Sequence, residues 1–134
     1  ANPDILNHNM ETVRRLQRPV RKTASWEVTT KVLEHAKARG FTTKSGIMLG
    51  IGEEQHEIEE TIRHMRQIGL DILTIGQYLQ PTPEQVPVER YWHPDEFSAL
   101  EAAGRTHGLE VFAGPFVRSS YRAEEAFLKV IGQG

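Results

Sequence analysis

The stretch that decides the fold is TKSGIMLGIGE, residues 43–53. Its centre is short and apolar, and glycines at positions 40 and 50 bound it. This pattern predicts a buried strand over Thr42–Leu49. Gly50 and Gly52 then allow a tight turn from the strand into a following helix. A buried strand that turns directly into a helix is typical of a parallel sheet covered by helices.

Strands and helices alternate on both sides of this stretch. Apolar residues at helical spacing, glycines and prolines mark the limits of the elements. The expected strands cover Asp4–Asn9, Thr42–Leu49, Asp71–Leu79 and Leu109–Ala113. The expected helices run from Ser25 to Gly40 with Val28, Val32, Leu33 and Ala36 inward, through Ile58, Ile62 and Met65 to Gly69, from Pro94 to Gly108 with Phe97 and Leu100 inward, and over Ala123–Val130. The fold class is therefore α/β.

Composition and charge limit the function classes. The chain has 134 residues, 38% hydrophobic and 25% charged, which fits one globular domain and excludes a disordered tail, a collagen or a coiled coil. Its net charge of −2 does not favour nucleic acid or acidic membranes as partners. No apolar run is long enough to span a membrane, and no basic and apolar leader precedes Asn2. We expect a cytoplasmic protein.

The chain contains no cysteine. This excludes a disulfide framework, zinc held by thiolates, thiol catalysis and an iron–sulfur cluster held by the chain's own thiolates. The six histidines show no metal-ligand spacing, since His56 and His64 lie eight residues apart and His8 is isolated. Ser119 and Ser120 have no evident His–Asp pair for a serine hydrolase.

Polar residues follow each of the four expected strands. Because parallel strands place their sites at their carboxyl ends, these groups are expected to share one face. The groups are Asn7, His8, Asn9 and Glu11; Gly50, Gly52 and Glu53; Gln77, Tyr78 and Gln80; and Arg118, Ser119, Ser120 and Tyr121.

Structural roles compete with functional ones at these positions. Asn7 and Asn9 are equally suited to making turns. The acidic residues from Glu54 to Glu60 are expected to complement a helix macrodipole, and the basic run from Arg14 to Lys22 to be a solvated connector. The larger aromatic residues Trp26, Trp92 and Phe97 are expected to pack in the core.

Four motifs occur in order along the chain: NHNMETV (7–13), TKSGIMLGIGE (43–53), LTIGQYLQP (73–81) and GPFVRSSY (114–121). Together they closely resemble the C-terminal half of lipoyl synthases, which are radical S-adenosylmethionine enzymes. The resemblance extends from about residue 3 to residue 126 and leaves 127–134 as a tail. It implies that residues 1–134 are the second half of a partial parallel (β/α)6 barrel of the TIM type, with a C-terminal extension.

The resemblance also implies an activity and its cofactors. The family inserts two sulfur atoms into a protein-bound octanoyl chain, using S-adenosylmethionine and two [4Fe-4S] clusters held by cysteines of the N-terminal half. One cluster generates a 5′-deoxyadenosyl radical, and the other is consumed as the sulfur source. The substrate is an octanoylated lipoyl-domain protein or glycine cleavage H protein. Without the N-terminal half, this chain is expected to hold no stable cluster and to be inert, and no catalytic residue is identified in it.

The resemblance assigns binding residues by motif. Residues matching the cofactor-binding positions are Asn9, Glu11, Arg21, Gly46, Met48, Gly50 and Glu53. Gln77 and Tyr78 match a segment that faces the octanoyl chain, and Ser120 matches a ligand of the auxiliary cluster. The sequence departs from the family at Lys22, where a proline is usual, and around residues 83–85, where the family has Arg-His.

Two other functions stay open. The chain is alternatively a binding module, a half-protein that docks onto a cysteine-bearing partner or onto the lipoyl carrier domain. A weaker hypothesis is an aldolase-type barrel fragment with Lys44 as a Schiff-base lysine, which requires a depressed pKa in a buried pocket.

Overall fold

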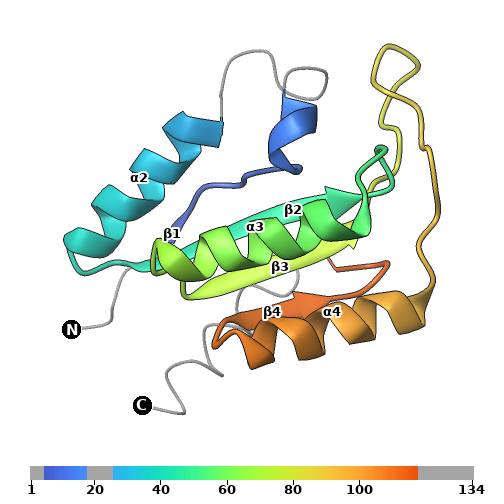
Figure 1. Ribbon diagram of the computed structural model, residues 1–134. Coiled ribbons are helices and arrows are strands. Elements are labelled where there is room, and N and C mark those ends of the chain that lie inside the picture. Colours follow the sequence, from blue (N-terminus) through green and yellow to red (C-terminus); the bar gives the residue numbers. More distant parts are fainter. Residues whose placement is uncertain (1–4, 18–25, 118–134) are drawn as a thin grey trace.

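The computed structural model describes residues 5–17 and 26–117. Within them, the sheet consists of β1 (Ile5–Asn7), β2 (Thr42–Leu49), β3 (Ile72–Gln77) and β4 (Glu110–Ala113). The helices are the short 3-10 helix η1 (Arg14–Leu16) and the α-helices α2 (Trp26–Ala38), α3 (Gln55–Gln67) and α4 (Pro94–Thr106). Strands and helices alternate as predicted (Figure 1).

The sheet is parallel throughout, with the strand order β1-β2-β3-β4. The pairing register places Gly46 beside Thr74 and Met48 beside Gly76. Each strand therefore lies next to its neighbour in sequence, and their carboxyl ends point the same way. The predicted α/β class with a parallel sheet is confirmed.

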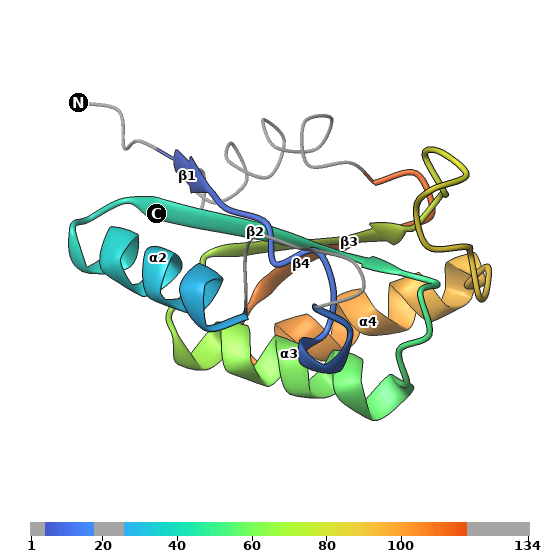
Figure 2. The same cartoon turned by 90° about the horizontal axis from the view of Figure 1, so that it is seen from above.

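All three α-helices cover the same face of the sheet (Figure 2). Strand residues that alternate toward this face form one core with the helices, among them Ile47, Leu49, Leu73, Ile75 and Val111. The helices contribute their own apolar stripes, including Ile58, Ile62, Met65, Phe97 and Leu100. The opposite face carries the separate buried pair Ile72 and Phe112.

Several element limits differ from expectation. β1 ends at Asn7 rather than Asn9, and β3 covers Ile72–Gln77 rather than Asp71–Leu79. In α2 the prediction that Val28 faces inward is wrong, since it is 51% exposed and Trp26 is buried instead. The expected final helix over Ala123–Val130 and the expected start of the first helix at Ser25 lie outside the described residues.

The helix ends follow local sequence signals. At the start of α3, Glu54 and Glu57 form a capping box, and His93 and Glu96 do the same at the start of α4. Pro94 occupies the first turn of α4 as predicted. Within the described residues, no helix is long and apolar enough to cross a bilayer.

Candidate functional site

A hollow of about 490 Å³ lies at the carboxyl ends of β2 and β3. Its lining includes Gly46 and Thr74, which lie on the sheet face away from the three α-helices (Figure 2). Five of the predicted binding residues line it together: Asn9, Glu11, Gly46, Met48 and Gln77. They come from the segment after β1 and from two neighbouring strands. The remaining lining residues are Ile47, Thr74, Gly76, Leu79, Pro81 and Val117. We call this hollow the strand-end pocket.

Glu11 is held over β2 in an unusual backbone conformation. Its φ is 74°, the one positive φ outside glycine among the described residues. Its amide donates to the Gly46 carbonyl at 2.8 Å, and its own carbonyl accepts from the Met48 amide at 2.9 Å. A left-handed glutamate stores backbone strain, which the two hydrogen bonds hold in place. Strain of this kind concentrates at ligand sites, and here it accompanies a carboxylate that lines the strand-end pocket.

The pocket floor is built from residues that are small or short. A methyl group on Gly46 would lie 2.6 Å from Thr74 Oγ1 and 3.2 Å from Asn9 Oδ1, so only glycine fits between them. Asn9 Oδ1 is buried and has no hydrogen-bond partner in the described part of the chain. An unpaired buried acceptor is costly, and a donor from a bound molecule would satisfy it.

The far wall of the pocket is apolar. Leu79 and Pro81 follow β3, and Val117 follows β4. Leu79 is 53% exposed although it is a large aliphatic residue. The pocket therefore has a polar side, formed by the segment after β1, and an aliphatic side, formed by the segments after β3 and β4.

Gly50 and Glu53 lie in the turn after β2 and do not line the strand-end pocket. Gly50 has a φ of 106°. The Glu53 carboxylate is buried and accepts hydrogen bonds from the Gly50 and Ile51 amides at 2.9–3.0 Å and from Trp92 Nε1 at 2.9 Å. Its oxygens are thus engaged within the chain, where they fix the turn.

Gln77 ends β3 and Tyr78 follows it, and their side chains have different surroundings. Gln77 lines the pocket, and its amide also binds the backbone of the next loop, with Nε2 donating to the Arg90 carbonyl at 2.9 Å. Tyr78 is 4% exposed in the core, and its hydroxyl donates to the Val86 carbonyl at 2.6 Å. Burial raises the pKa of Tyr78. Of this predicted pair, only Gln77 reaches the pocket.

Known proteins match this chain over nearly its whole length. The sequence profile of the radical SAM superfamily matches residues 1–65. The lipoyl synthase of Thermus thermophilus is 53% identical over 133 residues, which cover 96% of this chain and 41% of that protein. The lipoyl synthase of Flavobacterium psychrophilum is 47% identical over 96% of this chain and 45% of its own length. The chloroplastic lipoyl synthase 1 of Populus trichocarpa is 48% identical over 96% of this chain and 35% of its own length.

The resemblance to lipoyl synthases is confirmed. The chain spans less than half the length of these curated relatives. This agrees with the expectation that it matches only one half of a lipoyl synthase.

The strand-end pocket suits the cofactor of the lipoyl synthases. S-adenosylmethionine has a flat adenine, hydroxyl and amino donors, and a charged ammonium group. Gly46 leaves room for a flat ring close to the backbone, Asn9 offers an unsatisfied acceptor, and Glu11 offers a carboxylate. The described residues therefore offer groups complementary to a molecule of this kind.

Two predicted residues lie outside the described part of the chain, Arg21 and Ser120. Among the described residues, no three His, Asp or Glu side chains come together as a metal site. Lys44 is completely buried and absent from the pocket lining, although burial lowers its pKa as a Schiff-base lysine requires. Its placement favours a structural role.

Sequence reasoning assigned no site role to Thr74, Leu79 or Trp92, although it correctly expected Trp92 in the core. Thr74 becomes part of the pocket floor only through its register beside Gly46. Trp92 reaches Glu53 across 39 residues of sequence. Leu79 lies within one of the four motifs, but it was expected to be the last apolar residue of a strand.

Proposed function

We propose that residues 1–134 form the C-terminal half of a lipoyl synthase, the second half of a partial (β/α)6 barrel with a C-terminal extension. The complete enzyme inserts two sulfur atoms into an octanoyl chain bound to a lipoyl-domain protein or glycine cleavage H protein. The observation that carries this proposal is that five family-matched residues line one pocket at the carboxyl ends of the parallel strands. Identities of 47–53% along 96% of the chain support it.

In this proposal the chain's own residues bind and orient S-adenosylmethionine. Glu11 and Asn9 hold the polar ribose and methionine ends, while Gly46 and Met48 form the floor beneath the adenine. When reduced by an iron–sulfur cluster, the cofactor supplies a radical that abstracts hydrogen from unactivated carbon. The backbone bonds of Glu11 to β2 fix its main chain beside the pocket before the cofactor binds, which lowers the ordering cost of binding.

The rest of the cofactor set must come from outside this sequence. The chain has no cysteine, so the cluster thiolates belong to the part of the enzyme that matches the remaining length of the relatives. We propose that Ser120 supplies the one non-thiolate ligand of the auxiliary cluster. A serine oxygen is a harder ligand than a thiolate and suits a cluster that releases iron. Gly50, Glu53 and Arg21 stay proposed cofactor-site residues, with Glu53 acting through the turn that it fixes.

A chimera tests the proposal. This chain replaces the matched region of the Thermus thermophilus lipoyl synthase, to which it is 53% identical. After anaerobic reconstitution, we expect S-adenosylmethionine cleavage and conversion of an octanoylated carrier to its lipoylated form, measured by mass spectrometry. Ser120→Ala in the chimera is expected to abolish product formation, with Ser119→Ala as the matched control. A folded chimera with both clusters that cleaves no cofactor would refute the proposal.

A natural half-protein is the second candidate. Within the described residues, β1 pairs only with β2, and β4 pairs only with β3, so each has one edge without a strand partner. Such edges accept strands from another chain. The two candidates separate when the cysteine-bearing part is supplied unlinked. Product formation on mixing supports the half-protein, and formation only in the linked chimera supports a single chain.

A further inference from the structure

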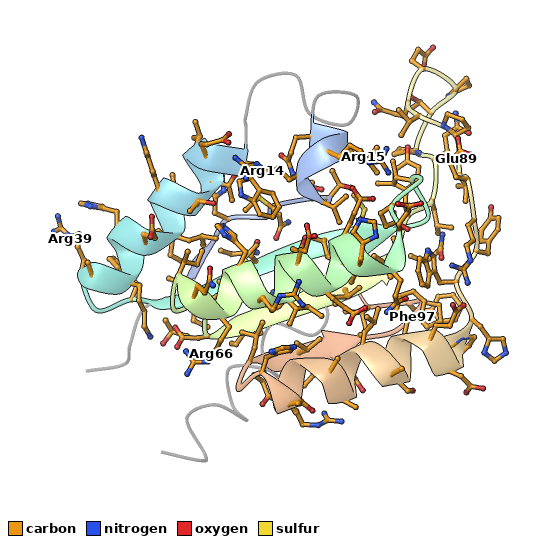
Figure 3. The ribbon with its side chains drawn as sticks, viewed as in Figure 1. Arg14, Arg15, Arg39, Arg66, Glu89 and Phe97 are labelled. Carbon is orange, nitrogen blue, oxygen red and sulfur yellow. The ribbon has the colours of Figure 1, made fainter. Side chains whose placement is uncertain are left out.

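The segment between β3 and α4, residues 78–93, has no helix or strand but is tied down at its returning end. The Glu89 amide donates to the Gly50 carbonyl at 2.7 Å, directly after β2. Glu89 stands on this returning stretch in Figure 3, near the upper end of the loop. Gly50 is the residue that allows the contact, because a methyl group there would collide with the Arg90 carbonyl oxygen.

Trp92 is the main anchor of the segment. Its side chain is 4% exposed, and its indole nitrogen donates to the buried Glu53 carboxylate at 2.9 Å. Its backbone amide donates to Gln77 Oε1 at 2.9 Å. The Arg90 guanidinium lies 3.9 Å above the indole ring, a cation–π contact that covers the anchor. One residue is thus held by the turn after β2 and by the end of β3.

The outgoing end of the same segment forms the aliphatic wall of the strand-end pocket. Leu79 and Pro81 line the pocket, and the amide of the preceding Tyr78 donates to the Leu49 carbonyl of β2 at 2.8 Å. Tyr78 therefore fixes the outgoing end of the segment to β2, and Trp92 fixes the returning end through Gln77 and Glu53. A large aliphatic side chain left 53% exposed at a pocket wall provides a contact for an aliphatic ligand.

We propose that the hydrogen bond from Trp92 to Glu53 is a latch that positions the 78–93 segment, so that Leu79 and Pro81 form the wall against which the aliphatic chain of the acyl substrate lies. Trp92 and Glu53 are positioning residues, and Leu79 determines specificity. This inference rests on the proposed function. It changes one residue of the sequence-based assignment, in which Gln77 and Tyr78 face the acyl chain. Leu79, rather than the buried Tyr78, contacts the acyl chain.

The latch has a physical reason to matter. A loop of this length without secondary structure loses much conformational freedom when it must form one wall. Charge-assisted hydrogen bonds to a buried carboxylate are among the stronger contacts that hold such a loop. Removing the indole donor takes one hydrogen bond from the buried Glu53 carboxylate, which keeps its bonds to the Gly50 and Ile51 amides, and frees the returning end of the loop to open.

The first test uses this chain and needs no activity. Trp92→Phe keeps an aromatic ring but removes the indole donor, and Glu53→Gln keeps the shape but removes the charge. Tyr91→Phe is the control, because Tyr91 is 70% exposed beside the anchor. We expect amide hydrogen exchange at Glu89 and Trp92 to rise at least tenfold in the two latch variants and to stay unchanged in the control. Circular dichroism checks that each variant folds.

The second test uses the chimera described above. Trp92→Phe and Leu79→Ser are expected to raise KM for the octanoylated carrier several-fold and to lower the preference for octanoyl over hexanoyl carriers, with a smaller change in kcat. Unchanged exchange at Glu89 in both latch variants would overturn the latch. Faster exchange with an unchanged chain-length preference would overturn the acyl wall. If the unmutated chimera forms no product, the proposed function fails, and binding of an octanoyl-lysine peptide to the chimera and its Leu79→Ser variant decides the wall instead.

Discussion

Replacing Gly50 by alanine is the sharpest test of the turn after β2. Gly50 has a φ of 106°, and a methyl group there would collide with the Arg90 carbonyl oxygen and the Gln77 amide nitrogen. Gly52 lies two residues on with a φ of 121°, yet a methyl group there meets only Glu89 Cγ at 3.8 Å. Both glycines therefore require the same class of backbone conformation, but only Gly50 is crowded.

The difference between the two variants isolates the crowding. A positive φ at a non-glycine residue is expected to cost about 1–3 kcal/mol at either position. Crowding at Gly50 adds roughly another 1–3 kcal/mol, because the colliding atoms belong to the backbone and to an amide that is already bonded. The free energy of unfolding should fall by about 2–6 kcal/mol in Gly50→Ala and about 1–3 kcal/mol in Gly52→Ala.

Urea unfolding of the chain, followed by tryptophan fluorescence, measures both values. The buried Trp92 lies beside this turn and reports its opening. In a double-mutant cycle, Gly50→Ala should cost less in a Gln77→Ala background than in the unmutated chain, since one colliding group is then absent. Equal destabilisation by Gly50→Ala and Gly52→Ala, to within about 0.5 kcal/mol, would refute the close approach of the loop to β2.

Three further outcomes are expected. Burial lowers the pKa of His64, so the unfolded chain takes up the proton first as the pH falls through 6.5. The free energy of unfolding should therefore decrease over that range. His64→Gln should flatten this decrease when denaturation is measured as a function of pH. The Arg15 guanidinium holds the pKa of Glu57 below 4.5, so the ion pair stabilises the fold at higher pH and is lost as acid protonates Glu57. Arg15→Gln should reduce the loss of stability in acid. An unchanged loss of stability in acid would contradict this role of the ion pair. Gly46→Ala places a methyl group 2.6 Å from Thr74 Oγ1 and should weaken S-adenosylmethionine binding by the chimera at least about tenfold in calorimetry, or about 1.4 kcal/mol.

The local sequence was enough to predict the elements with strong boundaries. Gly50 and Pro94 correctly mark the end of β2 and the start of α4. The inward face of α2 was predicted less well, because hydropathy alone favours Val28 over Thr29. The structure buries Thr29 completely and leaves Val28 at the surface. The side of α2 that faces inward depends on which residues contact the sheet. A stripe that mixes apolar residues with threonine does not determine that side from the sequence.

The site was partly predictable for a similar reason. Asn9, Glu11 and Gly46 lie in motifs next to strand ends, where parallel topology brings them together. The roles of Glu53 and Trp92 depend on a contact between distant segments, which no periodic pattern indicates. Residues whose neighbours are set by tertiary contacts therefore need the structure.

The strained backbone of Glu11 affects how this protein responds to laboratory evolution. A glycine at that position adopts a φ of 74° without penalty, so Glu11→Gly relieves strain while deleting the pocket carboxylate. A screen that rewards thermal tolerance alone is expected to enrich this replacement, and one that rewards turnover is expected to remove it. Libraries built to stabilise this domain should therefore keep position 11 fixed, because Glu11→Gly would gain stability and remove a proposed ligand contact.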